Sequence, residues 1–417
     1  LVRSRHFHHP LLTGIAMKKR IIIAGSGFAG MWAAISAARL VHMEKANDRI
    51  EIFLVSPEPA LTIRPRLYEA VLENMAPSIL HVLKAAGVHY IAGYVTDIDA
   101  ENKTISVKKE SGETSVNFDS FVLATGSQAF HPELPGITEY SFDVNSLNAA
   151  HELEQHLMSL ASEPYSPARN TVVVAGGGLT GLETATEMPE RLRDLLGSEH
   201  HLQVIIVDSS NKIGQAMGED ACEIINQALA SNGVTVRTGV RVRAINAEGV
   251  MLSDDEFIPS KTVIWTAGMR ASALAGLIPG DHDNLGRVIG DAYLRAPAAR
   301  GIFVTGDTVK VPTDDEGNYN VMSCQHAMSL GRVAGHNAAA EILGLPLHSY
   351  SQPKYVTCLD LGKWGAVYTE GWDHQVMYQG MEAKKIKQEI NTQWIYPPEP
   401  DREKMFSVAN PDYIIVP

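Results

Sequence analysis

Two glycine-rich segments are the first residues whose types and spacing indicate a chemistry. Gly25–Gly30 has the spacing G-x-G-x-x-G, and Gly176–Gly181 repeats it. The first glycine of such a segment makes a tight turn, the second lets the backbone approach a pyrophosphate, and the third lets a helix pack closely on a strand. The helix that follows presents free backbone N–H groups and a positive dipole end to the phosphates. Each segment therefore predicts a dinucleotide-binding site.

The elements needed to position these glycines surround both segments. An apolar run at 20–24 precedes the first segment and a helical pattern at 31–41 follows it, while the runs at 171–175 and 182–188 flank the second in the same way. Both units then continue with further expected strands and end in an apolar strand followed by Ala-Thr-Gly or Thr-Ala-Gly. One such motif is a weak signal because glycine is common in turns, but two copies in this context are specific. The sequence predicts an α/β protein with two Rossmann-like dinucleotide-binding domains.

The residue that ends the second strand of each unit indicates which nucleotide binds, because a carboxylate there accepts hydrogen bonds from ribose hydroxyls. In the second unit this residue is Asp208, and no arginine follows it at once. The carboxylate would repel a 2'-phosphate, so NADH is favoured over NADPH. In the first unit the position belongs to Ser56, with Glu58 two residues further on. This departure weakens the expected ribose contact but leaves the dinucleotide prediction in place.

Composition excludes several classes of protein. The 417 residues are 45% hydrophobic and 20% charged, which suits two or three folded domains and excludes wholesale disorder. A net charge of -13 disfavours nucleic acid as a partner. The three cysteines are too scattered for a disulfide scaffold, and the 16 histidines show no H-E-x-x-H spacing, so no metal site is predicted. No apolar run is long enough for a membrane-spanning helix.

These motifs resemble those of the two-dinucleotide flavoprotein reductases, and among them the type II (single-subunit) NADH dehydrogenases. The resemblance extends from about Lys19 to Leu343 and implies a glutathione-reductase-like fold, with FAD bound non-covalently in the first unit and NADH in the second. It depends on seven segments, which are Gly25–Gly30, Ile63–Glu69, Ala124–Gly126, Gly176–Glu183, Trp265–Gly268, Gly306–Asp307 and Cys324–Ala327.

The resemblance also implies roles for single residues. Asp307 would hold the ribityl chain of FAD, Pro65 would line the flavin face used by the electron acceptor, and Glu183 would lie beside the nicotinamide. The expected catalytic residues are Glu183, Gln325, His326 and Pro65. The expected FAD contacts are Gly25, Gly27, Phe28, Ala29, Gly30, Ser56, Arg64, Val95, Ala124, Thr125, Gly126, Gly306, Asp307, Gln325, His326 and Ala327. The expected NADH contacts are Gly176, Gly178, Leu179, Thr180, Gly181, Asp208 and Gly268.

The function implied is that of an FAD-dependent NADH oxidoreductase, in which hydride passes from NADH to N5 of FAD and two electrons then reach a quinone-like acceptor. Four alternatives stay open: a reductase of nitro, azo or dye-like molecules, a ferredoxin-type reductase, a sulfide- or persulfide-linked flavoprotein using Cys324 and Cys358, and a non-catalytic NADH sensor. The negative charge argues against the ferredoxin-type reductase, and buried structural thiols are the favoured interpretation of the two cysteines. Arg64 and Arg66 are candidates for neutralising a reduced flavin or an anionic acceptor, or for contacting phosphate.

The expected domains are an FAD-binding domain at 17–145 and 286–345, an NADH-binding domain at 146–285, and a C-terminal interface domain at 346–417. Residues 1–16 are interpreted as a leader ahead of Met17. The oligomeric state stays open, with a homodimer among the options.

The C-terminal domain contains the best amphipathic segment, Met381–Ile395. It places Ile386, Ile390 and Trp394 on one face beside lysines, and Glu382 and Glu389 dilute the positive charge. We expect this helix to dock on the protein body rather than on a bilayer, and the enzyme to be soluble and cytoplasmic.

Overall fold

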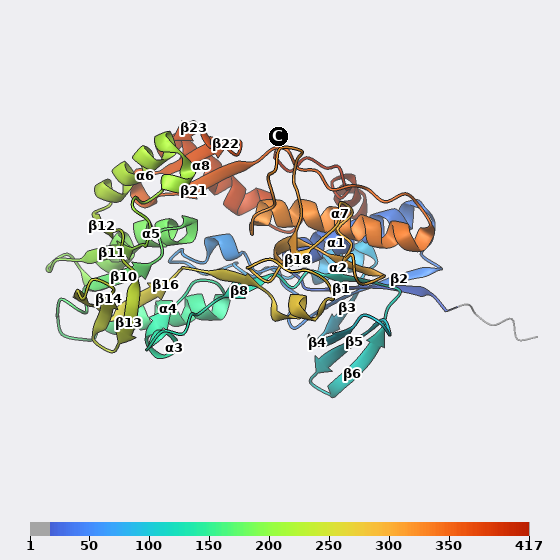
Figure 1. The fold of residues 1–417 in the computed structure, drawn as a ribbon, viewed down its shortest axis with the longest axis horizontal. Helices are drawn as coiled ribbons and strands as arrows, with labels where there is room; N and C mark the ends of the chain where they lie inside the picture. The colour runs from blue at the N-terminus through green and yellow to red at the C-terminus, as the bar shows by residue number, and fades with distance from the viewer. Residues whose placement is uncertain (1–16, 417) are drawn as a thin grey trace, which may run out of the picture.

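The computed structural model describes residues 17–416, so the predicted leader at 1–16 and the last residue lie outside the described residues. Two α/β units stand side by side, one built mainly from the first third of the chain and the other from the middle (Figure 1). A small C-terminal sheet and its helix lie over the junction between them. The predicted fold class, with two Rossmann-like units and a C-terminal region, is confirmed.

The first unit contains a five-stranded parallel sheet in the order β19-β7-β1-β2-β3. Ile21, Ile22 and Ile23 of the central strand are fully buried, because helices and loops cover both faces of the sheet. The strand β19 pairs with β7, so the chain returns to this sheet after it has built the second unit. The strands are β1 (Lys19–Ala24), β2 (Ile50–Ser56), β3 (His89–Ala92), β7 (Ser120–Leu123) and β19 (Ile302–Val304).

The second unit repeats this plan with the order β12-β11-β10-β16-β9. In both sheets the strand before the glycine segment lies in the centre, between the second strand of its unit and the strand that precedes the closing glycine. The strands are β9 (Ser141–Phe142), β10 (Thr171–Ala175), β11 (Gln203–Val207), β12 (Val234–Arg237) and β16 (Thr262–Trp265).

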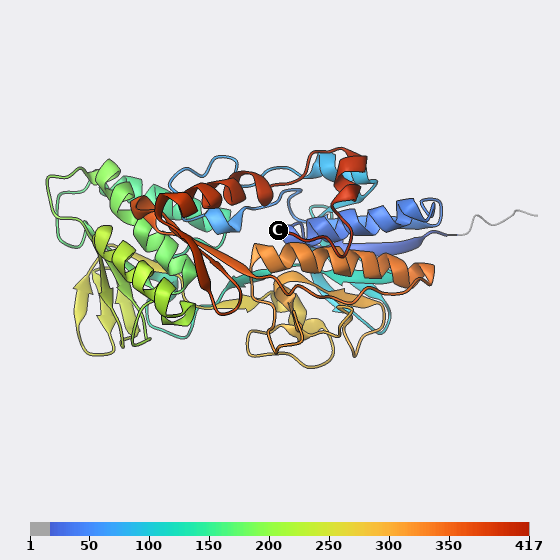
Figure 2. The same ribbon diagram turned by 90° about the horizontal axis from the view of Figure 1, so that it is seen from above.

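Two helices of the first unit run side by side against its sheet (Figure 2). They are α1 (Phe28–Met43) and α7 (Cys324–Leu343). A Cβ on Gly331 would lie 2.3 Å from the carbonyl oxygen of Ala29, and one on Gly335 would lie 2.0 Å from that of Ala33. The two glycines therefore let the helices approach closely, which fixes the first turn of α7 beside the first glycine segment.

Smaller elements complete the two units. Two small antiparallel sheets, β4-β5-β6 and β13-β14-β15, lie at the lower side of the two units in Figure 1, and the pair β8–β17 lies between the units. The remaining strands are β4 (Tyr94–Asp99), β5 (Thr104–Lys109), β6 (Gly112–Asn117), β8 (Ser127–Ala129), β13 (Val242–Asn246), β14 (Gly249–Leu252), β15 (Phe257–Pro259), β17 (Met269–Ala271), β18 (Val288–Ile289) and β20 (Val309–Lys310). The remaining helices are α2 (Leu80–Ala86), α3 (Ile137–Tyr140), α4 (Leu147–Leu160), α5 (Leu179–Leu196), α6 (Glu219–Ser231) and the short turns η1 (Arg64–Arg66), η2 (Gln215–Met217), η3 (Ala273–Leu277) and η4 (Gly306–Thr308).

The C-terminal region is a three-stranded antiparallel sheet followed by helices. Its elements are β21 (Val356–Asp360), η5 (Gly362–Trp364), β22 (Ala366–Glu370), β23 (Gln375–Gln379), α8 (Gly380–Glu389), the π-helix η6 (Ile390–Trp394) and α9 (Arg402–Ser407). Within residues 17–416 no helix has the length and apolar character that crossing a membrane requires.

The inward face of the predicted amphipathic helix differs from the predicted stripe. The segment is split into α8 and η6, whose buried residues are Ala383, Lys387 and Asn391, while Ile386 and Ile390 are half-buried and Trp394 is 42% exposed. A buried lysine is tolerated because it has a carboxylate partner on the neighbouring unit. The helix thus docks on the body of the protein, partly through polar residues that hydrophobic periodicity does not reveal.

Candidate active site

The first glycine segment has the geometry of a phosphate cradle. Gly25 has a φ of +115°, and a Cβ there would lie 2.0 Å from the carbonyl oxygen of Ala124, so no other residue fits without a shift. A Cβ on Gly30 would lie 1.9 Å from the carbonyl oxygen of Gly25. Gly27, which caps α1, is exposed, and a Cβ on it would meet no protein atom within 4 Å. The first and third glycines thus serve the fold, and the second presents bare backbone to a ligand.

The second segment repeats these relations, except that its first glycine faces a side chain instead of backbone. Gly176 has a φ of +117°, and its Cβ would lie 2.8 Å from Oγ1 of Thr266, the residue after β16. A Cβ on Gly181 would lie 1.9 Å from the carbonyl oxygen of Gly176, and one on Gly178 would meet no protein atom within 4 Å. Leu179 and Thr180 at the start of α5 are exposed. The helix start of the second unit is therefore accessible to a pyrophosphate.

Asp208 follows β11 and is tied to the second glycine segment. Its Oδ1 accepts a hydrogen bond from the backbone N–H of Gly177 at 2.9 Å, and its Oδ2 accepts one from that of Ser210 at 3.1 Å. Partial burial acts to raise the pKa of Asp208, but hydrogen bonds from the Ser210 hydroxyl and these N–H groups outweigh it, and the pKa lies below its usual value. The carboxylate stays ionised at neutral pH, as a contact to ribose hydroxyls requires.

Ser56, at the matching position of the first unit, is fully inside the protein. Its side chain is 3% exposed, and its Oγ donates to the carbonyl oxygen of Glu58 at 2.7 Å. The hydroxyl is therefore not presented to a ribose, and the predicted contact through this side chain does not agree with its burial. Val95, on β4, is half-buried.

Asp307 and Arg64 come together at the end of β19. Ser127 donates to Oδ2 of Asp307 at 2.6 Å, and Nη1 of Arg64 lies 4.0 Å from the same oxygen. Arg64 also donates to the carbonyl oxygens of Asn145 and Ser127, each at 3.1 Å. Burial raises the pKa of Asp307, although the Ser127 hydrogen bond and Arg64 oppose this. A carboxylate with an arginine beside it, next to the first cradle, fits the polar ribityl and phosphate part of FAD.

The first turn of α7 presents backbone rather than its histidine. The amide of Gln325 bonds both backbone groups of Val356, donating at 2.9 Å and accepting at 3.2 Å. The imidazole of His326 is fully enclosed, stacked near Tyr355 and Trp372, and its Nδ1 accepts the N–H of Val321 at 3.2 Å. Burial lowers the pKa of His326 to about 4, so the ring is neutral. The imidazole predicted to lie under the isoalloxazine is thus covered by protein, whereas Cys324 and Gln325 of the same turn are half-buried.

Glu183 forms a buried ion pair that the sequence did not reveal. Its Oε2 accepts the backbone N–H of Asp360 at 2.9 Å and lies 3.1 Å from Nζ of Lys387, which also donates to the carbonyl oxygen of Cys358 at 2.7 Å. Burial acts to lower the pKa of Lys387, but the carboxylate of Glu183 outweighs it, and the pKa lies above its usual value. The pair joins α5 of the second unit to α8. The lysine-rich run at 384–387 was the available signal, but it indicated a charged outer face.

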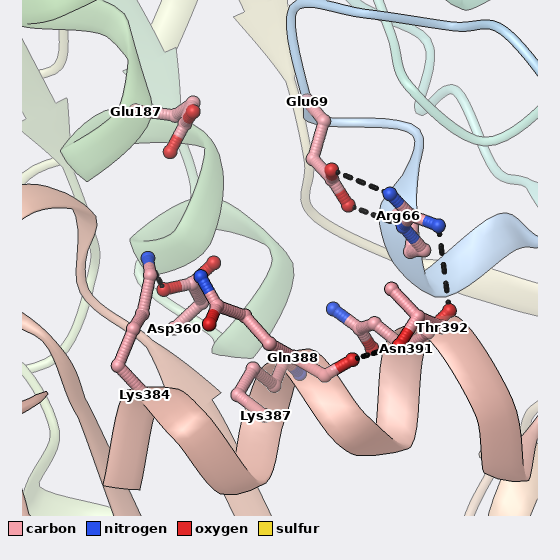
Figure 3. A pocket seen from close by; sticks show the side chains of 9 residues that line it. All are labelled: Arg66, Glu69, Glu187, Asp360, Lys384, Lys387, Gln388, Asn391 and Thr392. Carbon is pink, nitrogen blue, oxygen red and sulfur yellow. Dashed lines mark hydrogen bonds and ion pairs between the residues drawn. The ribbon is translucent and has the colours of Figure 1, made fainter. Parts of the chain in front are cut away.

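A polar cavity of 220 Å³ adjoins this pair and is lined by all three parts of the chain (Figure 3). Arg66 is held by both oxygens of Glu69 and donates to the hydroxyl of Tyr396 at 2.9 Å. Opposite them, Lys384 pairs with Asp360. Burial, with the nearby Asp360 carboxylate, raises the pKa of Glu187 to about 7. Arg66 therefore links the η1 segment to the C-terminal region through its hydrogen bond to Tyr396. Pro65, in the same segment, is half-buried.

Cys324 and Cys358 are half-buried thiols. Burial raises the pKa of Cys324 to about 11 and that of Cys358 to about 11. Both are therefore protonated at neutral pH, whereas the thiolate is the reactive form. Within residues 17–416, no group of histidines, cysteines and carboxylates could hold a metal ion.

Comparison with known proteins agrees with this geometry. Residues 19–331 match the family model described as pyridine nucleotide-disulphide oxidoreductase. An NADH dehydrogenase-like protein of Mycobacterium tuberculosis is 44% identical over 382 residues, which cover 91% of this chain and 94% of that protein. A demethylphylloquinone reductase of Synechocystis sp. is 28% identical over 84% of this chain and 86% of its own length. NDH2 from Plasmodium falciparum, solved in complex with NADH, has a similar fold, with a TM-score of 0.75, 14% identity, and 94% and 97% of the two chains covered.

Two Rossmann-like units with paired glycine cradles, an ionised strand-end carboxylate and an Asp–Arg pair define a two-dinucleotide reductase. The length of the match and the 44% identity identify the family. The chain belongs to the pyridine nucleotide-disulphide oxidoreductase family, without a redox-active cysteine pair after β2, since residues 57–75 contain no cysteine.

Proposed function

We propose that this protein is an FAD-dependent NADH oxidoreductase that passes electrons to a quinone-like acceptor. The observation that carries the proposal is the presence of two glycine cradles in one chain, each with its middle glycine open to a ligand. The relatives support it, since one is named NADH dehydrogenase-like and another is named a reductase of a quinone. When bound, FAD supplies the hydride acceptor at N5 and the two electrons that reduce the second substrate.

The residues of this chain would bind and orient the two nucleotides. The backbone of Gly27 and Gly178 would receive the two pyrophosphates at the starts of α1 and α5. Asp307, with Arg64, would hold the ribityl side of FAD, and Asp208 would accept hydrogen bonds from the ribose of NADH. These assignments agree with the exposure of the two middle glycines and the ionised state of Asp208.

The buried pair Glu183–Lys387 is proposed to form the polar wall beside the reacting nicotinamide. The ammonium of Lys387 keeps its proton at neutral pH because of the adjacent carboxylate. Reduction of a quinone to the hydroquinone by NADH takes up one proton. The raised pKa of Lys387 makes its ammonium a poor proton donor, so it would act as a fixed positive charge that stabilises negative charge on the reduced groups. Gln325 and Pro65 are proposed to border the acceptor. His326 is proposed to stabilise the first turn of α7 from the interior of the protein, without contacting a substrate.

We also propose the domain limits expected from the sequence, with FAD held by 17–145 and 286–345, NADH by 146–285, and the acceptor side formed by 346–417. The FAD would be non-covalent. We also propose that the enzyme works in the cytoplasm without membrane attachment. Two of the three lysines of α8, Lys384 and Lys387, support this, because they pair with carboxylates of the protein itself. A homodimer is one option for its assembly.

Anaerobic reduction by NADH, followed by reoxidation against quinones, nitroaromatics and a ferredoxin-like protein, tests the proposal. We expect a yellow protein with one FAD per chain, bleached by NADH and reoxidised fastest by a quinone. FMN instead of FAD, or no flavin after reconstitution, would contradict it. Stable reduction without turnover would favour a sensor, and faster reoxidation by nitroaromatics would favour a dye-type reductase.

A further inference from the structure

A second, larger cavity lies outside the predicted nucleotide contacts. It measures 420 Å³ and opens between α1, α7, the end of η6 and the last residues of the described chain. Pockets of roughly 300–1,000 Å³ are typical of small-molecule sites. The cavity is lined by Trp32, Met328, Arg332, Gln393, Trp394, Tyr396, Pro397, Pro398, Val408, Tyr413, Ile414 and Ile415. None of these residues is among the predicted FAD or NADH contacts, so the cavity needs an explanation of its own.

Its floor carries a buried arginine. Arg332 is 3% exposed, and its Cζ lies 3.7 Å from the ring centroid of Trp32 and 4.8 Å from that of Tyr413. Its Nε donates to the carbonyl oxygen of Val408 at 2.8 Å, and its Nη1 donates to that of Met328 at 3.1 Å. Nη2 meets no acceptor, and no carboxylate forms an ion pair with Arg332, among the residues that the structure describes.

This arrangement leaves a positive charge without a counter-charge in a desolvated place. Burial lowers the pKa of Arg332 to about 9, and the nearby Tyr413 only partly opposes this, yet the group is still cationic at neutral pH. A buried ion is costly unless a partner of opposite charge is present. The two aromatic faces relieve part of this cost through cation–π contacts, but they supply no full negative charge.

The mouth of the cavity is apolar. Trp394 is 42% exposed and Ile414 is 64% exposed, and prolines 397 and 398 lie beside them. The η6 segment that presents Trp394 is a π-helix, an irregularity that is frequent at functional sites. A ligand that fits both ends of the cavity therefore has an anionic head and a short apolar body.

We propose that this cavity binds a single-chain amphipathic anion, with its carboxylate or phosphate head on Nη2 of Arg332 and its apolar chain along Trp394 and Ile414. The site is separate from the proposed redox function, and its occupation is measured without turnover. Occupation would tie the C-terminal segment at 408–415 to α7.

Octanoate is the probe, compared with uncharged 1-octanol of the same chain length and with acetate, which lacks the chain. Calorimetric titration of the FAD-loaded protein should give one octanoate site per chain, weaker binding of 1-octanol and none of acetate. In the wild type, a charge-assisted hydrogen bond should make the affinity for octanoate about tenfold or more higher than that for 1-octanol. The Arg332→Met variant should lose this preference. Octanoate should also raise the thermal unfolding midpoint of the wild type.

Controls separate a ligand site from a structural arginine. Arg295→Met removes a half-exposed arginine that pairs with Asp291 at 2.7 Å, and it should leave octanoate binding unchanged. Should Arg332→Met fail to fold, Ile414→Asp places a negative charge at the exposed mouth, where it should weaken octanoate more strongly than 1-octanol, because only octanoate is repelled by the new charge in addition to losing the apolar contact. Equal binding of the two probes by the wild type, or octanoate binding unaffected by Ile414→Asp, overturns the proposal. Capture by anionic phospholipid vesicles without binding of octanoate would also overturn it, in favour of a lipid surface.

Discussion

The two glycine segments are nearly superposable in their steric demands and differ in the chemistry at the next strand end. In both, the first glycine has a φ near +116°, and a Cβ added to the third would lie 1.9 Å from the carbonyl oxygen of the first. At the end of the second strand the two units differ. The ionised carboxylate of Asp208 accepts a hydrogen bond from the backbone of Gly177, whereas Ser56 is buried and its hydroxyl donates to the carbonyl oxygen of Glu58. A shared backbone geometry thus prepares both units for a pyrophosphate, and the strand end decides how a ribose is recognised.

The largest expected effect is the loss of FAD from a variant in which the first glycine segment is disrupted and the second is left intact. In Gly25→Ala the new Cβ meets the backbone of Ala124 at 2.0 Å, whereas in Gly176→Ala it meets the side chain of Thr266 at 2.8 Å. Strain at a positive φ together with overpacking is expected to cost about 3 kcal/mol or more for Gly25→Ala. This variant should purify with little FAD, and Gly176→Ala should stay yellow but lose reduction by NADH. The ratio of flavin to protein absorbance measures the difference, and equal FAD loss in both would refute it.

A comparable effect concerns α7, which belongs to the first unit and has no counterpart in the second. Since the pKa of His326 is lowered to about 4 in the fold, against about 6.5 when unfolded, its neutral form stabilises the protein above pH 6.5. That stability should decline by about 3 kcal/mol as the pH falls from 6.5 to 4, and no further below it. Denaturant unfolding across this range measures it. His326→Asn should flatten this part of the profile, and an unchanged slope in the variant would contradict the assignment.

The strand-end difference predicts an effect of intermediate size. Asp208→Ala should narrow the preference for NADH over NADPH by about ten- to a hundredfold, because a charged hydrogen bond contributes roughly 1.5–3 kcal/mol. Ser56→Ala is the matched change in the first unit and should leave this preference unaltered. Steady-state kcat/KM for both nucleotides provides the measurement. A wild-type preference for NADPH would show that Asp208 does not contact the ribose.

The smallest effect is expected at Cys324 and Cys358, because both thiols are protonated at neutral pH. Replacing Cys324 and Cys358 together by serine should keep NADH:quinone turnover within about fivefold, since the hydride route to a flavin requires no sulfur. Stopped-flow measurement of flavin reduction and reoxidation separates the two halves of the cycle. Loss of reoxidation with intact reduction would instead support sulfur chemistry.

The spacing of residues along the chain was sufficient to predict the features that depend on contacts between near neighbours in the sequence. The glycine turns, the strand before each and the helix after each follow from close steric contacts within a few residues, so the sequence revealed both cradles and the position of Asp208. The second strand end of the first unit was located correctly too. Whether the side chain of Ser56 faces a ligand or the interior depends on the loop that covers it, which periodicity does not describe.

Burial and charge pairing between distant segments were decided only by the tertiary structure. Glu183 and Lys387 lie far apart in the sequence, and each alone is an ordinary charged helix residue. Packing α8 against α5 removes both from water, and their mutual attraction then compensates the desolvation. The enclosure of His326 and the burial of Arg332 arise in the same way, because the desolvation of a group depends on every element packed around it and not on its neighbours in the chain.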